Sequence, residues 1–459
     1  MEGFELEATR RAPLAEATYR LFRFALDHEF LAQVFDRHRG RSYEAELSFT
    51  TVVHLLGDAL LEHAGSARRA LRQARGNAEL PVSNEAFYGK LRRIPQSLSQ
   101  GFLAQTTRRL LPLFVPTRSP IPPTLQQFEV LAVDGKKIKH VAKRLKPTRA
   151  FRGSVLGGKL LVALDLETGL AVAMNSNLDG EANDPPLVPG LLEEVRSVPR
   201  TRPRLYVLDR QFCDLKLPKL LTADGDHFLI RYHRKVTFTR DEDHPARTGT
   251  DAAGRTFTDE RGWLGRADHK QRRYVRRVTV HREGEEDVSV LTDLLDEEAF
   301  PGAELLELYR QRWGIERVFQ QVTEVFHLQQ LVASSPQGTI FQAAFCLLLY
   351  NLLQVQRSYV AAAQQIEQER ISLENLFYDV RRQLIAWNEL IPRGWTLAHF
   401  AGTPTLSSTQ QRLHALLDTQ WKPAWLKATN KKHRPKQLEP PHSGGHTSIH
   451  RLLHPNHET

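Results

Sequence analysis

The residues best suited to chemistry in this sequence are a tyrosine, an arginine and a glutamate that share one face of an expected helix. Residues 303–331 contain no proline and a single glycine, and their large apolar residues recur at helical spacing. Tyr309, Arg312 and Glu316 are separated by steps of three and four residues, so they lie on one side of such a helix. A carboxylate can hold a metal ion while a guanidinium and a phenol hold phosphate. An Arg and a Glu one turn apart also form ordinary surface ion pairs, so the spacing alone leaves both interpretations open.

The wider pattern resembles the signature of DDE transposases of insertion sequence family four. In that signature an Arg follows a Tyr after two intervening residues and a Glu follows after three more, as in Tyr309, Arg312 and Glu316. The Lys that the family carries further along corresponds to Thr323 here, which is a departure from the pattern. The Tyr-Asn-Leu segment at 350–352 is also similar to sequences in such enzymes. The resemblance implies two more catalytic carboxylates upstream, each at the end of a strand.

Two aspartates fit that expectation. The apolar stretch 128–135 reads as a strand that ends in Asp134, and 204–210 reads as a buried strand that ends in Asp209. The resemblance implies that Asp134, Asp209 and Glu316 meet as catalytic residues and metal ligands. Carboxylate oxygens suit hard cations, so we expect two Mg²⁺ or Mn²⁺ ions in each active site. Two such ions, about 3.5–4 Å apart, activate the attacking oxygen and stabilise the leaving oxygen of a phosphodiester.

Further residues could assist catalysis or bind DNA. The resemblance assigns phosphate contacts to Tyr309 and Arg312. Trp263 is the candidate for stacking on an extruded base, although packing in the core of its own domain is the slightly favoured alternative. Additional candidate acids are Asp165, Glu181 and Asp184. The other candidate DNA contacts are basic side chains, namely Lys136, Lys137, Arg210, Arg68, Arg72, Lys90 and Arg93.

The overall composition is consistent with a polyanionic partner. The 459 residues have a formal net charge of +10, and residues 136–152 contain eight Lys and Arg residues and no acid. Such a charge favours binding to nucleic acid, because it releases counterions from phosphate, although many basic proteins bind none. Cys213 and Cys346 lie among apolar residues and read as reduced core thiols. We expect no signal peptide and no membrane-spanning run of eighteen apolar residues, hence a cytoplasmic, nucleoid-associated protein of bacterial type.

The N-terminal region reads as helical and basic. Arginines crowd the segment before Gly76, a helix stop, and Ser83 is a plausible N-cap for the next helix. Two short basic helices around a proline-containing turn could form a helix-turn-helix-like reader of duplex DNA, but solvated helix faces have the same composition. Both interpretations stay open.

The order of elements indicates an α/β fold. From residue 128 the chain reads as strand, hairpin, helix, strand, helix and strand before the signature helix, which matches an RNase H-like mixed sheet with flanking helices. The expected divisions are residues 1–115 for an all-α DNA-binding domain, 116–127 for a linker, 128–232 for the first part of the core, 233–292 for a β-rich insertion before the last catalytic helix, 293–360 for the catalytic helix and the helix after it, 361–426 for a C-terminal helical region, and 427–459 for a basic, His-rich disordered tail.

These expectations combine into a functional hypothesis. The sequence is interpreted as a cut-and-paste DNA transposase that binds the ends of an insertion sequence as a homodimer or larger synaptic complex. It would cleave strands with the help of divalent metal and transfer them to target DNA. The alternatives are a metal-dependent DNA nuclease or recombinase on the same fold, and a DNA-binding regulator without catalysis.

Overall fold

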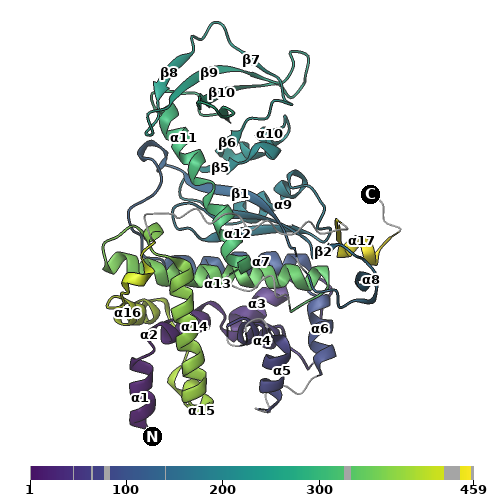
Figure 1. Cartoon of the computed structure of the whole chain (residues 1–459), viewed down its shortest axis with the longest axis vertical. Helices are drawn as coiled ribbons and strands as arrows, with labels where there is room; N and C mark the ends of the chain where they lie inside the picture. Colours follow the sequence, from purple (N-terminus) through teal and green to yellow (C-terminus); the bar gives the residue numbers. More distant parts are fainter. Residues whose placement is uncertain are drawn as a thin grey trace.

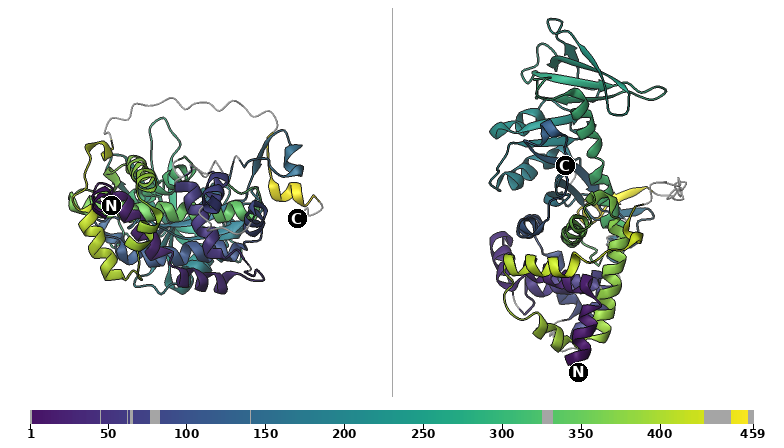
Figure 2. Two further views of the ribbon diagram at one scale, coloured as in Figure 1. Left: turned by 90° about the horizontal axis from the view of Figure 1, so that it is seen from below. Right: turned by 90° about the vertical axis from the view of Figure 1, so that its left-hand side faces the viewer.

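The computed structural model describes residues 2–44, 46–61, 63, 66–76, 83–139, 141–324, 332–427 and 445–455. Along its longest axis, a helical base is followed by a central mixed sheet and then by an extension of that sheet (Figure 1). The side view in Figure 2 shows the same succession in an elongated molecule. The N-terminus lies at the end of the helical base (Figure 1). The expected α/β class, with an N-terminal helical region and a large mixed sheet, is confirmed.

The helical base combines the first part of the chain with helices near its other end. Asp27 accepts a hydrogen bond from the Phe30 amide at 3.1 Å, and Ser83 accepts one from the Ala86 amide at 3.2 Å, so each starts a helix as an N-cap. The N-terminal helices are α1 (Glu2–Arg10), α2 (Pro13–Ala25), α3 (His28–His38), α4 (Phe49–Leu61), α5 (Ala67–Gly76), α6 (Asn84–Arg92) and α7 (Gln96–Leu110). Those from the C-terminal part are α14 (Leu373–Leu390), α15 (Arg393–His399) and α16 (Leu406–Leu417).

One long helix joins the base to the sheet. Helix α13 (Pro336–Ala363) packs against α7, α2, α14 and strand β4, and almost all of its residues are buried. It has no charged residue from Pro336 to Gln356, so the expectation that no segment is apolar enough to span a membrane was wrong for this helix. Because its whole apolar window is buried inside the fold, we interpret α13 as the core helix of the molecule.

The central sheet positions the expected carboxylates. Its strands are β1 (Glu129–Lys137), β3 (Lys159–Asp165), β4 (Ala171–Asn177), β5 (Arg204–Leu208) and β6 (His227–Arg231). Their order is β4-β3-β1-β5-β6, with the β1–β3–β4 pairs antiparallel and the β1–β5–β6 pairs parallel. Alternate residues of β5 belong to two cores. Leu205 and Val207 belong to the core that contains α13, whereas Tyr206 and Leu208 belong to the core with residues of α9 (Val188–Arg196) and α10 (Leu217–Leu221).

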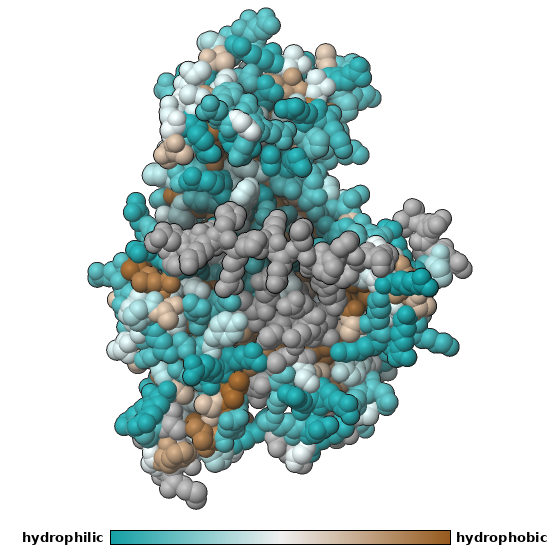
Figure 3. Space-filling model, viewed as in Figure 1, coloured by the Kyte–Doolittle hydropathy of each residue, from teal (hydrophilic) through white to brown (hydrophobic). Residues whose placement is uncertain are grey.

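The expected β-rich insertion continues this sheet. Strand β11 (Val288–Thr292) pairs antiparallel with β6, and β10 (Arg273–Val280), β9 (Thr256–Leu264), β7 (Phe238–Arg240) and β8 (Arg247–Thr250) follow outward. The Arg276 guanidinium is fully buried and donates to Asp259 at 2.8 Å and to the Phe300 carbonyl at 2.7 Å, which ties β10 to the segment before helix α11. The visible surface of the extension is mostly hydrophilic (Figure 3).

The signature segment differs from its expected form. Instead of one helix over 303–331, the structure has α11 (Gly302–Gln311) and α12 (Gly314–Glu324), and residues 325–331 lie outside the described part. The break falls at Arg312 and Trp313, where the Arg312 and Ile315 amides donate to carbonyls three residues back. Two such bonds tighten the turn and re-aim the second helix. Trp313, at this break, is exposed.

The expected linker and tail also differ from the sequence interpretation. Within 116–127, Leu125 is fully buried and the Thr124 hydroxyl donates to Glu304 at 2.8 Å, so this segment packs on the core. Residues 428–444 of the expected tail lie outside the described residues, but 445–455 are ordered. There, β12 (His446–Ser448) pairs with β2 (Ser154–Leu156) and leads into α17 (Ile449–Leu453), close to α8 (Lys146–Arg149). A tail without core contacts was therefore the wrong expectation for 445–455, because Ile449 is fully buried.

Candidate active site

Asp134 lies where one side of strand β1 loses its partner. The parallel pairing with β5 ends at Val133 and Leu208, whereas the antiparallel pairing with β3 continues to Lys137. Asp134 therefore lies inside the strand. The sequence interpretation, which placed it at the end of the strand, was wrong on this point. Its carboxylate accepts a hydrogen bond from the Gly135 amide at 2.8 Å, and its side chain is 13% exposed.

Asp209 occupies the neighbouring position at the end of β5. It follows Leu208 directly, so the β1–β5 register places it next to Asp134. Its carboxylate accepts a hydrogen bond from the Gln211 amide at 2.8 Å, which starts a short turn of 3-10 helix. The two aspartates thus share one edge of the sheet, as the ends of adjacent parallel strands do.

Arg312 connects this edge to the signature helices. Its guanidinium contacts Asp134 at 3.1 Å and Glu316 at 3.0 Å, and its side chain is only 5% exposed. The Glu316 side chain is 55% exposed and leans over the sheet edge from the first turn of α12. Three side chains that the sequence separates by as many as 182 positions therefore form one ionic cluster, with the arginine between the two acids.

The electrostatics of the cluster follow from burial. Burial raises the pKa of Asp134 to about 6, against the lowering effects of Arg312 and the Gly135 amide, and Asp209 and Glu316 add to the rise. Burial likewise raises the pKa of Asp209, and Asp184 contributes in the same direction. These carboxylates repel one another at short range, and Arg312 supplies the compensating charge.

Tyr309 borders the cluster from helix α11. Its ring lies 5.8 Å from the Arg312 guanidinium carbon, and it is buried. Its hydroxyl makes no hydrogen bond to any residue that the structure describes. Burial raises the pKa of this phenol, while Arg312 and Arg231 act against the rise. Thr323, at the position of the family Lys, donates to the Phe319 carbonyl at 2.7 Å and brings no cation to the site.

Asp184 is a fourth acid at the edge. It is 3% exposed, pairs with Lys159 at 2.5 Å and accepts a hydrogen bond from the Gln211 side chain. A Cβ at Gly135 would collide with its carboxylate, so only glycine fits there. The sequence interpretation named Asp184 among spare acids, but it missed Lys159 and Gln211; Gln211 stands two residues after Asp209, whereas nothing in the sequence marks Lys159.

The donor set fits a hard divalent cation by its chemistry. Asp134, Asp209 and Glu316 offer carboxylate oxygens, which are the ligands that hard cations prefer. Among the described residues, however, no three acid, His or Cys side chains converge tightly enough to be a ready-made metal site. Arg312 takes the position of the counter-charge between two of the acids.

The other candidate acids lie outside the cluster. Asp165 accepts hydrogen bonds from Thr168 and the Glu167 amide in the β3–β4 turn. Glu181 pairs with Arg451 of the C-terminal segment. Both therefore have local structural partners, and neither joins the ionic cluster of Asp134, Arg312 and Glu316.

The candidate DNA contacts are scattered. Lys136 and Lys137 follow Asp134 on β1, and Lys136 lies 5.8 Å from the Phe319 ring. Trp263, 36% exposed, packs against Tyr274 and Arg272 on the outer strands. Of the other candidates, Arg210 beside Asp209, Arg68 and Arg72 on α5, and Arg93 after α6 are exposed.

Lys90 contradicts its assignment as a DNA contact. It is 7% exposed, its amine donates to the Tyr43 carbonyl at 2.9 Å and it lies 4.8 Å from the Phe35 ring. Its aliphatic stem and charge both serve the packing of α6 on α3. Sequence position on a basic helix could not separate this lysine from its exposed neighbours.

Comparison with known proteins defines the class of protein that carries this site. Residues 125–352, 228 of the 459 residues, match the family model described as "Transposase DDE domain". The matched segment includes Asp134, Asp209 and Glu316. The match places a segment similar to transposase DDE domains over just under half of the chain, and it supports a DNA transposase; DDE transposases generally use divalent metal ions.

Two further comparisons complete this result. The solved structure described as "Cryo-EM structure of piggyBac transposase synaptic complex with hairpin DNA (SNHP)" is similar with a TM-score of 0.40 and 12% identity, over 87% of this chain and 85% of that chain. At this TM-score, the similarity supports no conclusion about the site. Among curated proteins, none matches this sequence.

Proposed function

We propose that this protein is a cut-and-paste transposase of the insertion sequence family four type, with Asp134, Asp209 and Glu316 as its catalytic carboxylates. The observation that carries the proposal is the contact of Arg312 with both Asp134 and Glu316, at 3.1 Å and 3.0 Å. A surface ion pair would join Arg312 to Glu316 alone. Here the same arginine also reaches a buried strand of the sheet, beside Asp209.

The proposed role of each residue follows from its place. Asp134, Asp209 and Glu316 would hold two Mg²⁺ or Mn²⁺ ions, which supply activation of the attacking oxygen and stabilisation of the leaving oxygen. Arg312 keeps the acids together in the DNA-free chain and binds a DNA phosphate in the complex. Tyr309, whose buried hydroxyl has no hydrogen-bond partner among the described residues, donates to the same phosphate.

The wider proposal covers the assembly. Two transposon ends must be cut together, so the working form is a homodimer or larger synaptic complex on DNA in the bacterial cytoplasm. The exposed arginines of α5 bind the duplex away from the cut. Trp263 is also exposed on the outer strands, and its proposed role is to stack on a base near the transposon end.

The decisive experiment separates cutting from binding. In Glu316→Gln, cleavage of end DNA with Mg²⁺ should fall at least about a thousandfold, because a ligand carboxylate is lost while shape and size are kept. DNA affinity in Ca²⁺ should stay within about twofold, because the phosphate contacts remain. Asp209→Ala should behave alike, and Glu307→Gln, an exposed acid on α11, serves as the control with full activity.

Two results would contradict the proposal. Normal cleavage by Glu316→Gln would remove Glu316 from catalysis, and a parallel loss of binding and folding would make its role structural. Transfer of a cut 3′ end into a second duplex is the assay that distinguishes transposition from simple nuclease action.

A further inference from the structure

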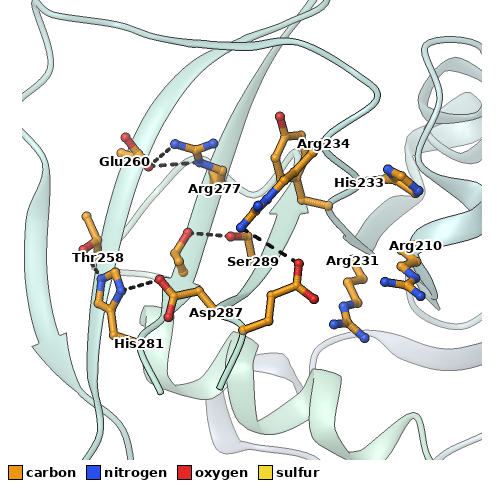
Figure 4. Close-up of a pocket in the computed structure, with 13 residues that line it drawn as sticks. Arg210, Arg231, His233, Arg234, Thr258, Glu260, Arg277, His281, Asp287 and Ser289 are labelled. Atoms are coloured by element: carbon orange, nitrogen blue, oxygen red, sulfur yellow. Dashed lines mark hydrogen bonds and ion pairs between the residues drawn. The ribbon is translucent and has the colours of Figure 1, made fainter. Parts of the chain in front are cut away.

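A polar recess lies where the central sheet meets its extension. Its volume is about 360 Å³, and the ends of β5 and β6 form one side of it while β9, β10 and β11 form the other. Figure 4 shows Arg210 and Arg231 together on one side, across from the Glu260–Arg277 and His281–Asp287 pairs. The recess is therefore lined mainly by charged groups, and Thr258, which contacts His281, and Ser289 add hydroxyl groups to its lining.

The acids of the recess already have basic partners. Arg277 donates to Glu260 at 2.9 Å and 2.6 Å, and Asp287 pairs with His281 at 2.9 Å. Glu286 has Arg234 as its more distant partner, at 3.9 Å. These pairs account for every acid that lines the recess, so its remaining arginines have no acid partner among the lining residues.

Arg210 and Arg231 are those cations. Neither guanidinium makes a hydrogen bond or an ion pair with a residue in the described ranges, and Arg231 is only partly exposed. Both guanidinium groups lie on the same side of the recess (Figure 4), so an anion bound there would be attracted by both. Guanidinium groups bind phosphate oxygens in a two-point geometry, which makes a phosphate the fitting anion.

The recess adjoins the catalytic edge. The β5–β6 register pairs Leu208 with Ile230, so the next residue on each strand, Asp209 and Arg231, are also neighbours. Arg231 is also close enough to Tyr309 on α11 to affect its ionisation. If one phosphate of a DNA strand lies at Asp209, the next phosphate of that strand would lie near Arg231, because Asp209 and Arg231 are separated by only one strand spacing.

We propose that this recess binds a backbone phosphate of the unpaired DNA strand that leaves the active site, held between Arg210 and Arg231. The inference rests on the proposed function, because it needs DNA at Asp209. A volume of 360 Å³ is near the lower end of the range for small-ligand sites, about 300–1,000 Å³, so it admits one nucleotide unit and excludes a duplex. Because the proposed contacts are to phosphate, the site should not discriminate between bases.

The test measures the affinity gained from an unpaired extension. Fluorescence anisotropy in Ca²⁺ would compare a blunt duplex of mixed sequence with the same duplex carrying a single-stranded extension of about five nucleotides. The wild-type protein should bind the extended DNA more tightly. In Arg231→Gln, the affinity for the extended DNA should fall about tenfold, and the salt dependence of that binding should lose about 0.7 in slope. The affinity for the blunt duplex should change little.

Matched variants make the result specific. Arg240→Gln removes the same charge from exposed strand β7, outside the recess, and should keep the full advantage. Arg231→Lys should keep most of it, because the charge remains. Thermal unfolding of each variant shows that the fold is kept.

The outcomes separate this inference from the proposed function. Equal affinity of the wild type for both DNAs, or an advantage that Arg240→Gln loses as much as Arg231→Gln does, overturns the recess as a strand site. Failure of the wild type to bind either DNA overturns the proposed function itself.

Discussion

At the scale of single residues, Arg312 provides the positive charge that balances the acids of the site. It is almost fully buried and faces acids from two directions, so it works as an internal counter-ion in the chain without DNA. The same guanidinium is the group that the family resemblance assigns to phosphate. The sequence pattern placed Arg312 and Glu316 together correctly, but the contact with Asp134 depends on the fold and has no sequence signal.

Arg312→Gln should therefore destabilise the protein. Breaking a buried pair strands the carboxylate of Asp134, which costs about 2–4 kcal/mol of unfolding free energy after allowance for the exposure of Glu316. Chemical denaturation measures this loss. Arg310→Gln on the same helix, whose pair with Glu307 is exposed, should change stability by less than about 0.5 kcal/mol. Equal losses in both variants would show that the Asp134 contact does not form in solution.

At the scale of elements, the apolar patterns of the sequence predicted the kinds and order of the strands but not where each element begins and ends. The apolar strands of the core were recognisable because buried strands are continuous runs of apolar residues. The break between α11 and α12 was missed, since Gly314 is the only weak helix former near it and Arg312 itself favours a helix. The C-terminal strand and helix were missed because their few apolar residues contact a distant part of the chain.

The β3–β4 hairpin should show a pH-dependent stability through Asp165. Burial raises the pKa of this carboxyl to about 6 from 3.8, so the folded chain holds its proton more tightly than the unfolded chain does. Its charged form opposes folding above pH 6, and that cost is relieved as the pH falls toward 4. The stability of the wild type relative to Asp165→Asn should thus increase from pH 7.5 to pH 5, by no more than about 1.4 kcal/mol per pH unit.

Melting temperatures of the two proteins across this range provide the check. A constant difference between them would mean that Asp165 does not titrate with a raised pKa in the folded chain.

The docked C-terminal segment should contribute measurably to stability. Ile449 is fully buried where α17 begins, and Arg451 pairs with Asp179 at 2.8 Å. Ile449→Ala should cost about 2–4 kcal/mol, because it removes buried methyl groups and leaves a cavity. Leu390→Ala, at a site 56% exposed, is the comparison and should cost little. Unchanged denaturation of Ile449→Ala would show that the segment is detached in solution.

At the scale of the whole molecule, the net charge is +10, and the basic side chains behind it differ in role: some pack in the fold and others are exposed. Composition predicted a polyanionic partner, and the DDE domain agrees with it. Composition could not tell which cations are exposed. Arg68 and Arg72 are exposed on α5, whereas Lys90 is buried against Phe35.

A charge-neutralising pair of variants should separate these roles. Arg68→Gln with Arg72→Gln should weaken duplex binding severalfold and reduce the salt slope by about 0.9 per lost phosphate contact, with an unchanged melting temperature. Lys90→Gln should lower the melting temperature, because the buried amine loses its hydrogen bond to Tyr43. Salt-dependent anisotropy and thermal unfolding measure the two effects. A melting temperature that falls in the arginine variant would assign α5 to packing instead.

The buried position of α13 has a practical consequence for any attempt to dissect this chain. A single apolar core runs from Ala12 to Ile449, and this helix touches α2, α7, α14 and α16 as well as the sheet. Residues 125–352, expressed alone, would contain only the first part of α13, and without α2, α14 and α16 the apolar surface of that part would be exposed to water. We therefore expect such a fragment to aggregate when it is expressed alone, because large exposed apolar surfaces associate.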